Sequence, residues 1–151
     1  TSARYRPMPG TPETIIAFDF GLRRIGVAVG QQVTNSANPL GAIGNGEDGP
    51  DWERIASLVR EWQPARLVVG MPAHADGSPS ELGKFATAFI HDLARFDLPV
   101  DAVDERYSSV EAEALLKSRR KQGLRGRISK ADIDAAAATL IAERWLKMEH
   151  Q

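Results

Sequence analysis

Three groups of acidic residues in this chain have the side-chain chemistry to hold a cation or activate a water molecule. Asp19 lies at the end of the apolar run IIAFDF, Asp104 and Glu105 end the run LPVDAVDE, and Asp132 and Asp134 lie in KADIDAAAATLI. A carboxylate beside a buried strand costs several kcal/mol to desolvate unless a cation or hydrogen-bond donors meet it. Asp19 therefore has two interpretations, as a brace for the glycine turn that follows it or as a ligand for a cation or a phosphate.

The elements that position these acids follow from the apolar pattern and from the turn residues. Residues 14–20 and 24–30 predict a hairpin, 38–44 a weaker third strand, and 65–72 and 98–105 two further strands. Helices are expected over 52–62, with Asp51 as its cap, over 82–96 along the stripe Leu82, Phe85, Phe89, Leu93 and Phe96, from Ser108, and from Ser129 to about Lys147. This order predicts one α/β domain over 14–148, a mixed sheet with helices on its faces, after a disordered tail at 1–13.

Strand alternation places Asp19 on the same face as Ile15 and Ala17, turned towards a covering helix. Asp104 and Glu105 end a later strand, and sites in open α/β sheets tend to lie beyond the carboxyl ends of strands. If the two strands are neighbours, a carboxylate pair forms at one rim. Parity alone does not choose between Asp104 and Glu105, and a strand-end salt bridge with Arg106 is the simpler alternative.

The last helix offers a third acid. Asp134 lies on the flank of the expected sheet-facing stripe, whereas Asp132 lies towards solvent and suits a capping role with Ser129. Four alanines follow Asp134, and their small side chains allow a helix to lie close to a sheet. We therefore favour Asp134 over Asp132. The expected stripe is Ile133, Ala136, Ala137, Leu140, Ile141, Trp145 and Met148.

The donor types favour a hard cation. The chain has no cysteine, and His74, His91 and His150 share no metal-ligand spacing. Converging carboxylates suit Mg²⁺ or Mn²⁺, as one or two ions. His74 lies in a loop near the expected rim and is a second-rank candidate, together with Asp104 and Asp132.

Charge is distributed unevenly along the chain. The net charge is −1, but the stretch KSRRKQGLRGRISK (117–130) holds seven basic residues and no acidic one. Such a segment is either a solvated loop or a contact for a polyanion, and we favour the polyanion.

The remaining composition excludes some classes. No apolar run is long enough to cross a bilayer, and the beginning of the chain lacks the apolar segment of a signal peptide. The absence of cysteine suits a reducing compartment. We therefore expect a cytoplasmic protein with no membrane partner.

Four blocks, in order, resemble the YqgF/RuvX family of Holliday-junction resolvases and pre-16S rRNA nucleases: DFGLRRIGVAVG (19–30), VVGMPAHADGS (68–78), DERYSSVEA (104–112) and KADIDAAAATLI (130–141). The resemblance implies an RNase H-like fold, a five-stranded mixed sheet of order 3-2-1-4-5 with helices on both faces. It implies catalytic, metal-binding acids at Asp19, Glu105 and Asp134. The activity it implies is a metal-dependent nuclease, which matures the 5′ end of pre-16S rRNA or cleaves junctions.

The chain departs from the family pattern in its substrate contacts. Leu22-Arg23 stands where Thr-Lys is common, His74 where Asn is usual, and Ser109 where Thr is common. The acids are unaffected. Residues expected to bind nucleic acid are Arg23, Arg24, Arg106, Arg119, Arg120, Lys121, Arg125, Arg127 and Lys130. A homodimer is expected only if a junction is cleaved symmetrically, because that needs two active sites.

Two other classes compete with a nuclease. One is a catalytically silent nucleic-acid-binding factor in ribosome assembly or transcription. The other is a nucleotide-binding module, since the Asp-x-Gly turn between two strands also resembles the phosphate loop of actin-like ATPases. Those proteins close two such domains around ATP, and 151 residues supply one.

Overall fold

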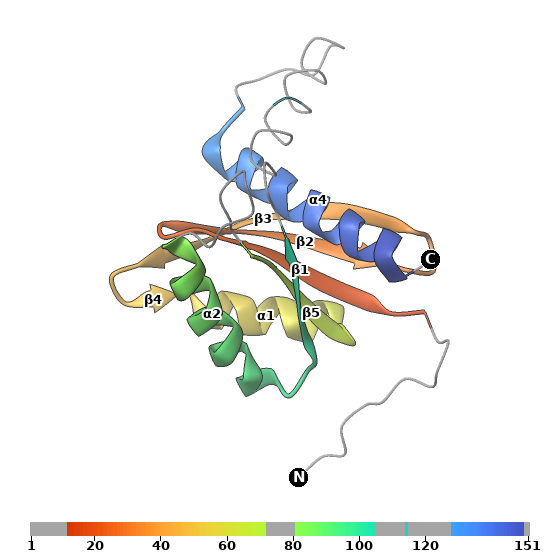
Figure 1. Cartoon of the computed structure of the whole chain (residues 1–151), viewed down its shortest axis with the longest axis horizontal. Coiled ribbons are helices and arrows are strands. Elements are labelled where there is room, and N and C mark those ends of the chain that lie inside the picture. The colour runs from red at the N-terminus through yellow and green to blue at the C-terminus, as the bar shows by residue number, and fades with distance from the viewer. Residues whose placement is uncertain (1–11, 72–80, 105–113, 115–127, 150–151) are drawn as a thin grey trace.

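The computed structural model describes residues 12–71, 81–104, 114 and 128–149 (Figure 1). Its strands are β1 (Thr14–Phe20), β2 (Arg24–Gln31), β3 (Ser36–Gly46), β4 (Gly49–Pro50), β5 (Arg66–Met71) and β6 (Val100–Asp104). Its helices are α1 (Trp52–Trp62), α2 (Leu82–Asp92), the 3-10 helix η1 (Leu93–Phe96) and α4 (Lys130–Glu149).

The strands form one mixed sheet of order β4-β3-β2-β1-β5-β6. The pairs β1–β2, β2–β3 and β3–β4 are antiparallel, while β1–β5 and β5–β6 are parallel. Without β4 this is the predicted order 3-2-1-4-5, so the fold prediction is confirmed. The prediction of five strands was wrong by one, because β4 has only two residues and shows no alternation that a sequence pattern would reveal.

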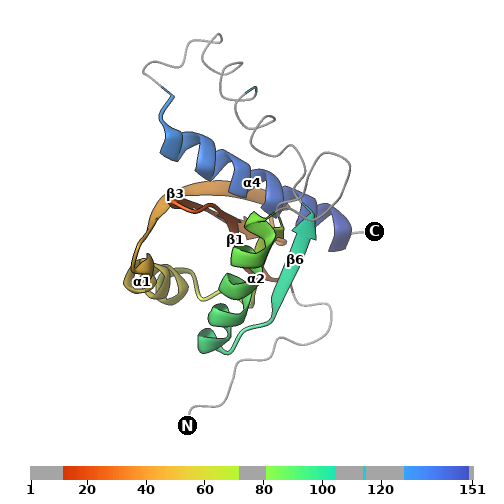
Figure 2. The same ribbon diagram turned by 60° about the vertical axis from the view of Figure 1, so that its left-hand side comes forward.

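Helices cover both faces of the sheet, as predicted: α1 and α2 lie on one face and α4 on the other (Figure 2). Alternation along β1 divides its apolar residues between the two sides. Ile16 and Phe18 belong to the core under α1 and α2, and Ile15 and Ala17 pack beneath α4. The face of Asp19 is therefore the face that α4 covers.

The predicted stripe of the second helix was partly wrong. Phe85 is 55% exposed, and Ala86 is buried in its place. Phe89 fills the centre of this core, with ring centroids 5.4 Å from Phe18 and 5.7 Å from Trp52. The sequence pattern favoured Phe85 because its side chain is larger. Residue 86 lies on the same helical face as residue 89, however, just as residue 85 does.

The helix α4 lies close to the sheet because its buried side is small. Residues 135–138, all alanine, are buried. Further along, Ile141 and Trp145 are buried, as predicted. Met148 is 59% exposed, which contradicts its predicted place in the stripe; Leu146 is buried instead.

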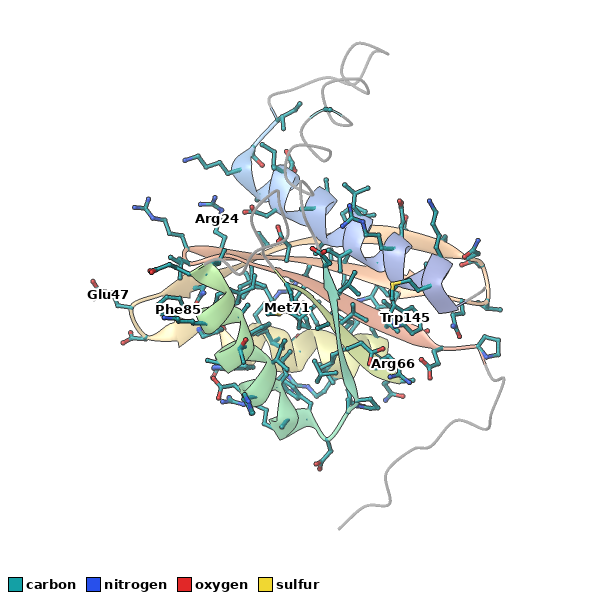
Figure 3. All side chains as sticks on the ribbon, viewed as in Figure 1. Arg24, Glu47, Arg66, Met71, Phe85 and Trp145 are labelled. Atoms are coloured by element: carbon teal, nitrogen blue, oxygen red, sulfur yellow. The ribbon has the colours of Figure 1, made fainter. Side chains whose placement is uncertain are left out.

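Polar contacts hold the far end of α4 to the sheet. The indole Nε1 of Trp145 donates to Asp101 Oδ2 (2.9 Å), and Arg66 Nη1 donates to Asp101 Oδ1 (3.1 Å). Arg66 also pairs with Glu13 (3.1 Å from Nε to Oε2), so residue 13 of the predicted tail contacts the sheet, while residues 1–11 lie outside the described ranges. Figure 3 shows Trp145 and Arg66 at one end of the sheet and Arg24 at the other.

None of the helices in the described ranges combines the length and the apolar character that a bilayer crossing requires.

Candidate active site

Asp19 is the second-last residue of β1 and is partly buried. Its neighbours in register are Gly26 on β2 and Gly70 on β5. Residues in register point to the same face of a sheet, and neither neighbour carries a side chain. The carboxylate of Asp19 therefore points towards α4. The two positions beside it carry no side chains that would keep the helix away from the sheet.

Asp134 of α4 lies directly over one of these two glycines. A Cβ atom built on Gly26 would lie 1.9 Å from the carbonyl oxygen of Asp134 and 3.1 Å from its Cα. Since Gly26 is paired with Asp19, the structure brings Asp19 and Asp134 to neighbouring positions on one face of the sheet. The close approach depends on the absent side chain at Gly26 and on the alanines that follow Asp134.

Arg24 forms an ion pair with Asp134. Its Nε lies 2.6 Å from Asp134 Oδ2, and the two side chains are 37% and 22% exposed. Arg24 is the first residue of β2, so the pair joins the turn after β1 to the beginning of α4. Sequence reasoning assigned Arg24 to phosphate and did not anticipate this contact with an acid.

The parallel strands β1, β5 and β6 place their carboxyl ends at the same edge of the sheet. Val103 is in register with Gly70, and both Val103 and Asp101 face α4. Val100 packs on the opposite core. By this alternation Asp104, which is exposed, lies on the face opposite to Asp19. Glu105 lies outside the described residues.

Asp132 has the capping role that the sequence suggested. Its carboxylate accepts a hydrogen bond from the Ser129 backbone N–H (2.9 Å), and its own N–H donates to Ser129 Oγ (3.1 Å). This reciprocal pair is a capping box at the start of α4. The backbone hydrogen bond from Ser129, followed by the one from its side chain, lowers the pKa of Asp132 below its usual value. Asp132 therefore stabilises the helix that carries Asp134.

Asn45 braces the turn that follows Asp19, and sequence reasoning missed it. Its side-chain Nδ2 donates to the carbonyl of Gly21 (2.7 Å), and its backbone N–H donates to the carbonyl of Arg23 (2.9 Å). Asn45 is 6% exposed, a buried amide on β3. The only signal in the sequence was a polar residue among the glycines at the end of the expected third strand.

Two other predicted contacts fall in the described ranges. Arg23 is exposed in the turn between β1 and β2, and Lys130 is exposed as the first residue of α4. Lys130 precedes Asp134 by four residues, about one helical turn. The remaining candidates lie outside the described residues: His74, Arg106, Arg119, Arg120, Lys121, Arg125 and Arg127.

Within the ranges that the structure describes, no group of three histidine or acidic side chains forms a complete metal site. Asp19 and Asp134 supply carboxylate oxygens from two elements on one face. This partial donor set suits a hard cation that is completed by a further acid and by water.

Relatives of this chain match most of its length. It is 46% identical over 138 residues to a protein of Dechloromonas aromatica, covering 91% of this chain and 92% of that protein. It is 47% identical over 146 residues to a protein of Nitrosococcus oceani, covering 93% and 90%. Both relatives carry the name "Putative pre-16S rRNA nuclease".

Solved structures share the fold at low sequence identity. Thermus thermophilus RuvC in complex with a Holliday junction substrate superposes with a TM-score of 0.52 at 16% identity, over 91% of this chain and 96% of that chain. The fowlpox virus resolvase in complex with Holliday junction DNA superposes with a TM-score of 0.53 at 10% identity, over 91% and 99%.

The family model described as "RuvX: Holliday junction resolvase" matches residues 13–148. The match includes all six strands of the described residues, α4 up to its second-last residue, and both acids that the structure brings together. The chain belongs to this RuvX family.

Proposed function

We propose that this protein is a nuclease that uses Mg²⁺ or Mn²⁺ to hydrolyse phosphodiester bonds, and that its substrate is the 5′ region of precursor 16S rRNA. The observation that carries the proposal is the placement of Asp134 over Gly26, beside Asp19, on one face of the sheet. The names of the relatives support the choice of rRNA, and that substrate assigns the protein to the cytoplasm.

We assign the third acid to Glu105. Asp101 and Val103 face α4 and Asp104 faces away from it, so Asp104 is the weaker candidate, and the family resemblance carries the third acid over to Glu105. Val103 is two strands from Asp19, about 10 Å across the sheet at the usual strand spacing. A longer Glu side chain suits a ligand that has to reach back towards the centre.

The donors fit the proposed cation. Asp19, Asp134 and Glu105 would hold one or two Mg²⁺ or Mn²⁺ ions through oxygen, which these ions prefer. Bound there, such ions would activate a water molecule and stabilise negative charge on the phosphate. Close packing of α4 on β2 and the capping box at Ser129 hold Asp134 in place.

Basic side chains around the acids would position the nucleic-acid backbone. Arg23 and Lys130 are exposed, in the turn after β1 and at the start of α4, the two elements that carry Asp19 and Asp134. The basic segment 117–130 extends the same charge along the chain, and we propose that it binds further phosphates. Contacts of this kind fix the position of the substrate without reading its sequence.

A four-way DNA junction is the second candidate substrate, favoured by the description of the family. Symmetric cleavage of a junction needs two active sites, so this candidate also requires a second copy of the chain. Light scattering with and without a junction tests that requirement.

Paired substitutions test the assignment of the acids. Asp134→Asn and Glu105→Gln should each lower cleavage of labelled precursor rRNA by at least about 100-fold, beyond the usual loss for a residue that only supports a ligand. The matched controls Asp132→Asn and Asp104→Asn should retain most activity, because the Asp132 carboxylate is engaged in the capping box and Asp104 faces away from Asp19.

Two results would contradict the proposal. If Asp132→Asn lost as much activity as Asp134→Asn, or Asp104→Asn as much as Glu105→Gln, the assignment of the acids would be wrong. Wild-type protein that binds the RNA with metal present and does not cut it would identify a nucleic-acid-binding factor instead of an enzyme.

A further inference from the structure

The ion pair between Arg24 and Asp134 joins a basic residue to one of the proposed metal ligands. The Nε–Oδ2 distance of 2.6 Å is that of a short, charge-assisted hydrogen bond. Both side chains are partly shielded from solvent, at 37% and 22% exposure. The contact therefore places the positive charge of Arg24 directly beside the Asp134 carboxylate.

A guanidinium and a divalent cation bind the same atoms of a carboxylate. Oδ2 of Asp134 accepts a hydrogen bond from Arg24, so a cation that approaches this oxygen competes with the guanidinium for its lone pairs. The positive charge of Arg24 also repels an arriving cation over a few ångströms.

We propose that Arg24 is a displaceable counter-cation: it holds Asp134 in the metal-free protein and competes with the divalent ion for that carboxylate. The inference rests on the proposed function, because it requires Asp134 to be a metal ligand. The displaced guanidinium becomes available for a substrate phosphate, in agreement with the nucleic-acid contact that we assign to Arg24. Metal binding and substrate binding are thereby coupled through one side chain.

Calorimetric titration with MnCl₂, without nucleic acid, tests this competition. Arg24→Gln should bind Mn²⁺ about fivefold more tightly than the wild type, the upper end for an ion pair of this exposure. Arg23→Gln is the matched control, since it removes the same charge from the neighbouring, exposed position. Its Mn²⁺ affinity should stay within about twofold of the wild type, because exposed charges are screened.

A second measurement uses the unaltered protein and does not depend on the folding of a variant. In ¹H–¹⁵N NMR spectra, the Nε–H resonance of Arg24 should shift when Mg²⁺ is added, as its hydrogen bond to Asp134 is broken. A resonance that stays unchanged at saturating Mg²⁺ would overturn the proposal, as would equal Mn²⁺ affinity in the wild type and Arg24→Gln.

An Asp134→Asn titration separates this inference from the proposed function. If Asp134→Asn binds Mn²⁺ as the wild type does, Asp134 is not a ligand, and both the metal site and the competition are wrong. If Asp134→Asn no longer binds Mn²⁺ while Arg24→Gln matches the wild type, the metal site stands and Arg24 has only a structural role.

Discussion

The glycine beneath Asp134 offers a direct way to move one acid away from the other. Gly26→Ala adds a Cβ atom that would lie 1.9 Å from the Asp134 carbonyl oxygen, whereas real Cβ contacts are essentially never shorter than 3.0 Å. The first turns of α4 or the strand β2 must therefore move by at least about 1.1 Å, the difference between these distances. The clash is with backbone, so no side-chain rotation relieves it.

The energetic cost and the functional cost of this change should differ. Overpacking of this kind typically costs about 1–3 kcal/mol of stability, which many domains of this size survive. A displacement of about 1 Å in a catalytic group can lower the rate about 100-fold. We therefore expect Gly26→Ala to remain folded, to cleave about 100-fold more slowly and to bind Mn²⁺ more weakly.

The assay compares cleavage, Mn²⁺ titration and urea unfolding for Gly26→Ala and a matched control. Gly30→Ala lies on the same strand under the same helix, and its Cβ would lie 3.0 Å from Ile15 Cγ1 and 3.4 Å from Ala142 Cβ. These are side-chain atoms away from Asp19, so Gly30→Ala should affect stability and spare Mn²⁺ binding. A folded Gly26→Ala protein with wild-type cleavage and Mn²⁺ affinity would refute the argument that Asp134 must lie beside Asp19.

Three further predictions concern residues around the site. Asn45→Ala should lower the free energy of unfolding by about 1–3 kcal/mol, measured in urea, because the carbonyl of Gly21 is left without its donor; an unchanged value would show that the turn needs no brace. Asp132→Asn should be less stable than the wild type at pH 7, and the difference should shrink as the pH falls. The pKa of Asp132 in the folded protein lies below its ordinary 3.8, so its contribution is present above about pH 4 and disappears below it; a difference independent of pH in urea unfolding would contradict this. Neutralising the arginines of 117–130 should reduce the slope of log affinity against log salt by about 0.7–0.9 for each phosphate that the segment no longer binds, and an unchanged slope would remove this segment from the interface.

Much of the fold could be predicted from sequence because its signals are local. The alternation in β1 assigned Asp19 to the face beneath α4, and the Ser129–Asp132 pattern predicted the capping box. The placement of Asp134 on the flank of an alanine-rich helix also followed from helical periodicity. These features depend on residues close together in the chain, where spacing fixes direction.

The contacts that position the site depend on distant residues, and no local pattern reveals them. The Arg24–Asp134 pair spans 110 residues, and the bond from Asn45 to the Gly21 carbonyl spans 24. Phe85 was placed in the core by its size, but tertiary packing left room for Ala86 there. That Asp104 faces away from Asp19 also became clear only from the register of β6 against β5 and from the contacts of Asp101 and Val103 beneath α4.

The measurement that tests the central claim most directly is metal-dependent cleavage by the wild type and by Asp19→Asn. Labelled precursor 16S rRNA and a four-way DNA junction are each incubated with Mg²⁺, with Mn²⁺ or with a chelator. We expect the wild type to cut the RNA only when metal is present, and Asp19→Asn to cut neither substrate. Cleavage that survives the chelator or the Asp19→Asn substitution would contradict the metal-dependent nuclease, and binding without any cleavage would return Asp19 to the role of a structural turn residue.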